Sequence, residues 1–212
     1  MGKSTEGLQT PYTKDFLLLF TSTFLFFGGL QLLIPAIPLY VERMGGNRFE
    51  AGLAVGTLVV SALLFRPAVG SQIDRRGGKR FLTLGCLVAA LASLGYIPAS
   101  SLLPLLFFRT LHGLGLASFA TAAATLAANL SPEKRRGEAL GAFGIAYVAA
   151  IALAPALGAW ALNFLPFSFL FLASSALALL AFFVLLPIEG PPSKPEPPRG
   201  GFLQAISSRS VL

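Results

Sequence analysis

The sequence predicts an all-α integral membrane protein with six transmembrane helices. Its 212 residues are 55% hydrophobic and only 12% charged, whereas a soluble domain carries about 25% charged residues. The apolar residues gather in six long runs with little or no charge, and a helix needs about 20 such residues to cross a bilayer. The sequence lacks the alternating polar and apolar pattern of a membrane barrel. Lipid is therefore the expected surrounding of most of the chain.

The six expected spans follow one another with short connections. Residues 1–15 are polar and form an expected cytoplasmic segment, and the apolar run that follows is too long for a secretory signal peptide. Glycine and proline mark the boundaries between runs. The expected spans are residues 16–40, 51–70, 81–97, 102–130, 140–161 and 167–187. Residues 188–201 are rich in proline, as in an extended cytoplasmic linker, and residues 202–212 resemble the start of a seventh helix that is cut short.

Basic residues predict the orientation of the spans. Twelve of the 16 Lys and Arg residues precede span 1, follow span 6, or lie between spans 2 and 3 or spans 4 and 5. Short loops rich in Lys and Arg stay in the cytoplasm, so both ends are expected on the cytoplasmic side of the inner or plasma membrane. The net charge of +7 does not suggest nucleic-acid binding, because such a protein needs a basic face on a soluble fold. The single cysteine, Cys86, excludes an intrachain disulfide and a cysteine metal site, and no metal is expected.

The stretch GSQIDRRGGKR, residues 70–80, separates two uncharged runs. Gly70 is expected to let helix 2 pack closely against a neighbour, and Gly77 permits a turn too tight for most side chains. Asp74 can pair with an arginine or meet the positive end of a helix. Through the pattern G-x-x-x-D-R-x-G-x-K/R-R/K the chain resembles the major facilitator superfamily of secondary transporters. The resemblance implies a conformational latch made by Gly70, Asp74, Arg75, Gly77, Lys79 and Arg80.

Two more stretches extend the resemblance. SPEKRRGEALG, residues 131–141, resembles the family's helix 4–5 connector, the counterpart of the first motif in an inverted repeat. The resemblance therefore implies two inverted three-helix repeats that form the N-terminal half of a major facilitator fold. GLQLLIPAIP, residues 29–38, resembles the end of helix 1 in the twelve-helix drug:proton antiporter branch. Proline can bend a membrane helix, so we expect bends at Pro35, Pro38 and Pro155, although Ala154 replaces the glycine of that branch's helix 5 motif.

Four polar residues inside the spans are candidates for a substrate or proton pathway. Ionisable groups in a bilayer are costly and usually functional. FRTLHGLGLASFA resembles the family's helix 4 pattern R-x-x-Q-G-x-G, which implies that Arg109 handles protons or substrate; alternatively, it bonds backbone carbonyls and holds two helices together. His112 stands where the family often has Gln, and it is either a proton carrier or a hydrogen-bonded packing group. Gln31 and Tyr147 face a central cavity or bond across helices.

The resemblance implies a secondary active transporter that works by alternating access, with proton-coupled efflux of a small amphipathic compound or drug. Two alternatives stay open: an uptake permease for a sugar, amino acid or organic anion, and a truncated membrane module or assembly partner that transports nothing.

The expected partners are the bilayer, a small-molecule substrate and a missing C-terminal six-helix half. No cofactor is expected, the coupling ion would be H⁺, and no enzyme is expected because the spans hold no nucleophile–base pair. None of the nine Asp and Glu residues lies well inside a span, so the proton would need His112 or an acid elsewhere.

Overall fold

The computed structural model describes residues 13–131 and 135–188, and their regular structure is helical throughout. The helices are α1 (Lys14–Leu32), α2 (Ala36–Arg43), α3 (Arg48–Arg76), α4 (Gly78–Gly95), α5 (Leu102–Asn129), α6 (Arg136–Ala161) and α7 (Phe167–Leu185). Six spans are long and apolar enough to cross a membrane, with α1 and α2 sharing the first, Lys14–Arg43. The predicted all-α class is confirmed. Most of the expected N-terminal segment and linker, and the whole expected seventh-helix start, lie outside the described residues.

Local chemistry explains where several helices begin. The side-chain oxygen of Thr13 accepts a hydrogen bond from the backbone N–H of Phe16 and caps α1. Asn47 and Glu50 form a capping box at the start of α3, in which each side chain bonds the other residue's backbone N–H. Such side chains satisfy the free donors at a helix start. The extended backbone of Pro166 precedes the first residue of α7.

The second span, which is helix α3, is longer than expected. The sequence predicts a span that ends at residue 70 and a basic turn after it, but α3 continues to Arg76 and places Asp74 and Arg75 in its last turns. Only Gly77 separates α3 from α4, and its φ of 85° is the left-handed conformation that favours glycine. The basic turn is therefore even shorter than the expected spans implied, because the charged residues continue the helix beyond the apolar run.

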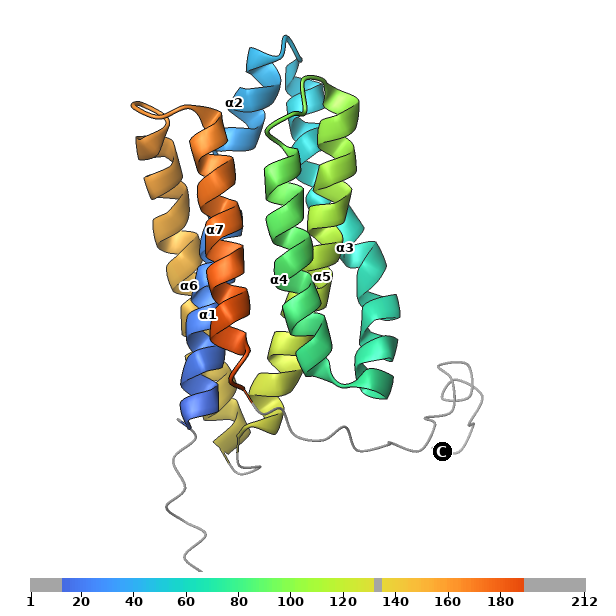
Figure 1. Cartoon of the computed structure of the whole chain (residues 1–212), viewed down its shortest axis with the longest axis vertical. Coiled ribbons are helices and arrows are strands. Elements are labelled where there is room, and N and C mark those ends of the chain that lie inside the picture. Colours follow the sequence, from blue (N-terminus) through green and yellow to red (C-terminus); the bar gives the residue numbers. More distant parts are fainter. Residues whose placement is uncertain (1–12, 132–134, 189–212) are drawn as a thin grey trace, which may run out of the picture.

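The helix contacts have a two-fold pattern. α1 packs on α6 and α7, while α5 packs on α3 and α4, and α4 packs on α7. Exchanging the first three spans with the last three (α1 with α5, α3 with α6, α4 with α7) leaves this set of contacts unchanged. This is the arrangement expected of two related three-helix repeats. Figure 1 shows α4 and α7 side by side, with the start of α1, the α3–α4 connection and the end of α7 at one end of the bundle.

Small residues allow the closest helix contacts. A Cβ added at Gly29 would lie 2.9 Å from the carbonyl oxygen of Ser174, so α1 and α7 touch through their backbones. α4 and α5 meet similarly through Gly85 and Gly115. Small residues serve membrane helices in this way because van der Waals packing, and not exclusion of water, drives their association.

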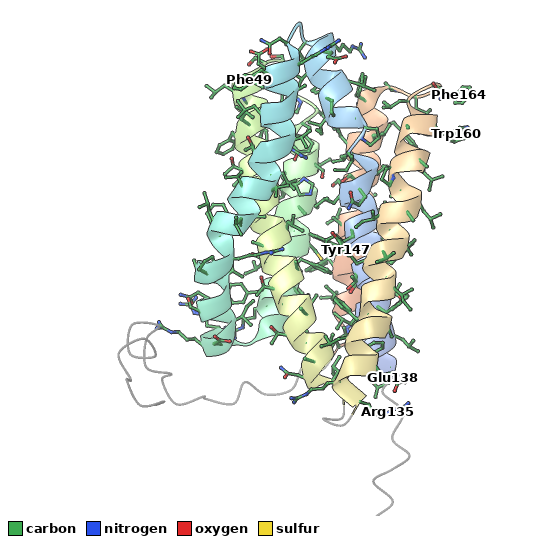
Figure 2. The ribbon with its side chains drawn as sticks, turned by 180° about the vertical axis from the view of Figure 1, so that it is seen from behind. Phe49, Arg135, Glu138, Tyr147, Trp160 and Phe164 are labelled. Carbon is green, nitrogen blue, oxygen red and sulfur yellow. The ribbon has the colours of Figure 1, made fainter. Side chains whose placement is uncertain are left out.

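One side of the bundle leaves its central helices uncovered. α4 packs against α7, whereas α3 and α6 have no comparable contact, and Figure 2 views the bundle from the side of α3 and α6. Of the six spans, α3 and α6 have the smallest buried shares of their apolar stretches, 28% for α3 and 17% for α6. Many large apolar side chains are therefore exposed, which requires lipid or further protein around them.

Candidate functional site

Arg109 points from α5 into the contact with α3. Its side chain is only 3% exposed, and its Nε donates a hydrogen bond of 2.9 Å to the backbone carbonyl of Ala54. One turn further, a Cβ at Gly113 would overlap the backbone of Leu58 and the hydroxyl of Ser61, so glycine is needed for this close approach. The contact is the one expected of an arginine that holds two helices together. Its role in proton or substrate handling stays a prediction.

His112 lies beside Arg109 and is bonded to the end of α4. Its Nδ1 is 2.8 Å from the hydroxyl oxygen of Tyr96, and both side chains are almost fully buried. The Tyr96 ring packs edge-on against Phe171 of α7, with 5.4 Å between ring centroids. The hydroxyl of Tyr40, on α2, donates to the carbonyl oxygens of Tyr96 and Ala99. A continuous polar network thus connects α2, the end of α4 and α5.

Sequence reasoning missed both tyrosines of this network. Tyrosine near the end of a span is common because its ring suits the membrane interface, so nothing in the sequence distinguished Tyr96 or Tyr40 from interfacial residues. The signal that could have found Tyr96 is weak: it follows a polar residue, Ser93, by about one helical turn in an otherwise apolar run.

Tyr147 belongs to a separate aromatic row in the middle of the bundle. Its side chain is 40% exposed and packs edge-on against Phe27 of α1, with ring centroids 4.6 Å apart. Phe27 in turn meets Phe119 of α5 at 6.1 Å, and Phe26 stacks on Phe119. Figure 2 shows Tyr147 about halfway along α6. The row connects α6, α1 and α5, and Tyr147 is its exposed end.

The four predicted pathway residues fall into two places. Arg109 and His112 share the buried contact of α5 with α3 and α4. Gln31 is half-buried on α1, and Tyr147 is exposed on α6. Within the described residues, no hydrogen bond or ring contact joins either of these two to Arg109 or His112. Their joint role in one pathway stays a prediction.

A groove of about 590 Å³ runs along another face of α5. Its lining is Leu103, Pro104, Leu106, Phe107, Phe108 and Thr110. Leu103 and Phe107 are 78% and 59% exposed, and their spacing with Thr110 puts all three on one face of the helix. Arg109 lies on a different face, against α3. This surface of α5 is therefore mostly apolar, and the hydroxyl of Thr110 donates to the backbone carbonyl of Leu106 on the same helix.

The expected latch lies at the end of α3 and the start of α4. Asp74 and Arg75 are exposed in the last turns of α3, and no ion pair involves Asp74 within the described residues. The backbone N–H of Gly77 donates to the carbonyl of Ile73 and ends the helix. Asp74 is thus presented with its carboxylate unpaired in this part of the protein. Its role as a latch stays a prediction.

Two other latch residues behave differently from each other. The Nζ of Lys79 donates to the backbone carbonyl of Leu186, 3.0 Å away, and so connects α4 to the end of α7, whereas Arg80 is exposed. The expectation that Gly70 packs closely against a neighbour was wrong for the described residues, because a Cβ there would meet nothing within 4 Å. At this level α3 turns Gly70 toward the uncovered side of the helix.

The three prolines occupy different helical positions. Pro35 precedes the first residue of α2 and follows a break after Leu32, so the chain changes helix there. Pro38 lies in the first turn of α2, where a missing backbone N–H is tolerated. Pro155 lies inside α6, which continues to Ala161.

The buried cluster is suited to hydrogen bonding and charge, but not to holding a metal. Residues 13–131 and 135–188 contain no group of three or more His, Cys, Asp or Glu side chains that could hold a metal ion. Arg109 supplies a fixed positive charge, and His112 and Tyr96 supply groups that both donate and accept protons. Such a set can hold a proton or orient a polar group inside an apolar bundle.

Comparison with known proteins gives one family. A family model described as Major Facilitator Superfamily matches residues 19–212. Multidrug resistance protein 2 of Bacillus subtilis is 28% identical over 169 residues, which are 78% of this chain and 41% of that protein. Quinolone resistance protein NorA of Staphylococcus aureus is 23% identical over 184 residues, which are 85% of this chain and 46% of that protein. The chain thus spans less than half the length of these curated relatives.

The fold also resembles a solved structure. The crystal structure of the human organic anion transporter MFSD10 (TETRAN) superposes with a TM-score of 0.69 and 17% identity. The match covers 84% of this chain and 47% of that one. At this identity the likeness shows the fold, and the six-helix bundle corresponds to about half of a larger protein.

Proposed function

Because this chain belongs to the major facilitator superfamily, we propose that it forms one half of a transporter that exports small amphipathic compounds in exchange for protons. The family consists of transporters, so the expectation that the chain is not an enzyme is confirmed by membership. The observation that carries the proposal is the similarity, over most of the chain, to two proteins named for resistance to drugs. The substrate, the direction of transport and the coupling ion belong to the proposal, whereas the family is shown by the match.

The exposed surface of α5 is one reason to propose an amphipathic substrate. The groove at Leu103, Phe107 and Thr110 offers apolar contacts and one hydroxyl, which matches the mostly apolar lining of small-molecule sites. Arg109, by contrast, is buried and bonded to Ala54. An uptake permease that holds a carboxylate with this arginine would first have to expose the buried guanidinium, so efflux of an amphipathic compound is the better supported function.

A second six-helix half is the proposed partner. The family places its substrate between two halves that alternate access to the two membrane sides. The uncovered side of this bundle, flanked by α3 and α6, is where such a half would complete the cavity. Asp74 and Gly70 lie on α3, and contact between this end of α3 and the second half would hold one transporter state. We propose a cell-membrane location with the basic end of the bundle in the cytoplasm.

Proton coupling is proposed through His112 or through an acid outside the described residues. No Asp or Glu side chain is among the buried polar residues of the described bundle. His112 is the one titratable side chain besides Arg109 among the buried polar residues of the described bundle, and it would carry a proton in a transporter state in which its contact with the Tyr96 hydroxyl has changed.

The test is efflux of ethidium, a fluorescent amphipathic cation, from a bacterial strain without its own drug pumps. The complete reading frame that contains this chain is expressed, and dye loss is followed with and without a protonophore. We expect loss faster than in cells with an empty vector, and abolished by the protonophore. A protein that reaches the membrane and leaves retention of ethidium and of a fluorescent quinolone unchanged would contradict the proposal.

A further inference from the structure

Tyr96 is held on several sides at the end of α4. Its side chain is fully buried at 0% exposure, and its ring packs against Phe171. Its backbone carbonyl accepts a hydrogen bond from Tyr40, and its hydroxyl meets Nδ1 of His112 at 2.8 Å. A buried side chain with this many contacts has a single orientation, so its hydroxyl is a fixed partner for the imidazole.

The surrounding charges determine which way this hydrogen bond runs. Arg109 interacts electrostatically with both Tyr96 and His112, and a guanidinium only donates hydrogen bonds. A positive charge beside the tyrosine attracts the oxygen lone pairs, which leaves the single hydroxyl hydrogen for His112. Nδ1 is therefore the acceptor, and the ring proton of neutral His112 lies on Nε2.

We infer that Tyr96 is a positioning residue of the proposed proton site: its hydroxyl donates to Nδ1 of His112 and keeps the ring proton of the neutral imidazole on Nε2. The hydrogen bond to Tyr96 occupies Nδ1 alone. Nε2 is thus the nitrogen that can gain a partner when the two halves of the transporter move. This inference rests on the proposed function for its consequence in transport, but the hydrogen bond itself can be measured without transport.

Nitrogen NMR of the histidine ring tests the arrangement directly. The described chain has a single histidine, and the complete protein labelled with ¹⁵N-histidine is compared with a His112→Gln variant to identify the two ring signals. In the unaltered protein we expect Nδ1 without a proton and Nε2 with one. Tyr96→Phe removes only the hydroxyl, so the Nδ1 signal should move to that of a nitrogen without a hydrogen bond. Tyr147→Phe, the matched control, removes a tyrosine hydroxyl from the separate aromatic row and should leave both signals in place.

Two NMR results would overturn the inference. One is a proton on Nδ1 in the unaltered protein, a measurement that needs no variant to fold. The other is an unchanged Nδ1 signal in a Tyr96→Phe protein that elutes and melts like the original.

Ethidium efflux tests whether the hydrogen bond serves transport. Tyr96→Phe should slow efflux roughly three- to tenfold, the effect of one buried hydrogen bond. If Tyr96 acts through His112, the double variant Tyr96→Phe/His112→Gln should be no slower than His112→Gln alone. If the double variant instead shows the product of the two single losses in efflux rate, the two residues act independently and the positioning role is overturned. If the unaltered protein moves no ethidium, the proposed function fails while the NMR result still decides the hydrogen bond.

Discussion

The rings of Phe26 on α1 and Phe119 on α5 lie face to face, with centroids 3.9 Å apart and planes inclined by 5°. α1 begins the first three-helix repeat and α5 begins the second, so this stack joins corresponding helices of the two repeats. Both side chains are almost completely buried, at 2% and 0% exposure. Since membrane helices associate through close packing, we expect the stack to stabilise the contact of α1 with α5, which is small beside the contacts of α1 with α6 and α7.

Phe119→Ala is therefore expected to destabilise the bundle by about 3 kcal/mol, because it leaves a cavity that its neighbours cannot fill. Phe107→Ala on the same helix is the matched control, since Phe107 is 59% exposed and leaves no cavity. Thermal unfolding of the purified variants in detergent measures the difference. Equal melting temperatures for the two variants would contradict the structural role of the stack.

Gly85→Ala tests the contact between α4 and α5. A Cβ at this position would lie 2.7 Å from the backbone nitrogen of Phe119 and 2.9 Å from the carbonyl oxygen of Gly115. Neither atom can move without shifting a helix, so we expect a loss of about 1–3 kcal/mol from overpacking. Gly56→Ala on α3 meets nothing within 4 Å and should be tolerated. Size-exclusion chromatography after heating measures the fraction of each variant that stays monodisperse. Equal fractions for Gly85→Ala and Gly56→Ala would refute the close contact of α4 with α5.

Gly77→Ala tests the short connection between α3 and α4. Gly77 has φ 85° and ψ 146°, a combination essentially restricted to glycine, and a side chain there costs about 1–3 kcal/mol. The neighbouring Gly78→Ala is the control, since its Cβ would make only ordinary contacts at 3.7 Å or more and alanine favours a helix. We expect a lower melting temperature for the first variant alone. A stable Gly77→Ala protein would show that the connection adopts another conformation.

The six apolar helices could be predicted because hydropathy reports the surrounding solvent, and long uncharged runs suit lipid. Prediction from the sequence failed where the answer depends on how a helix is rotated. Gly70 was expected to face a neighbour but faces open space, and Arg109 is turned into the α3 contact. Tyr96 was missed because its partner lies 16 positions away on another helix. No periodic pattern reveals such pairs in helices that are apolar on every side.

Asp74→Asn should reduce transport without reducing insertion. The substitution removes the negative charge from the last turns of α3 and keeps the shape of the side chain, so any ionic contact with the second half is weakened. A bias of 1–2 kcal/mol between two transporter states corresponds to a loss of about tenfold. Glu42→Gln, at an exposed carboxylate near the end of α2, is the control. Ethidium efflux is compared at equal amounts of protein in the membrane, and equal rates for both variants would rule out the latch.

Chemical labelling can show whether the groove on α5 faces water or lipid. The chain's only cysteine, Cys86, is fully buried, so it should not react with a water-soluble maleimide. A cysteine at position 110, made by Thr110→Cys, would lie in the groove and should react, because thiols attack as solvent-accessible thiolates. Ala117→Cys, at a buried position of the same helix, is the matched control and should stay unlabelled.

Protection by substrate then distinguishes a transport cavity from any other wet surface. If the groove lines the cavity, ethidium should slow labelling of Thr110→Cys in proportion to its occupancy, while a polar dye that is not exported should have no effect. A cysteine that reacts only with a membrane-permeant reagent would place this face of α5 in lipid. Equal labelling with and without ethidium would mean that the apolar groove does not bind the exported compound, and substrate contacts would then have to come from α1, α6 or the second half.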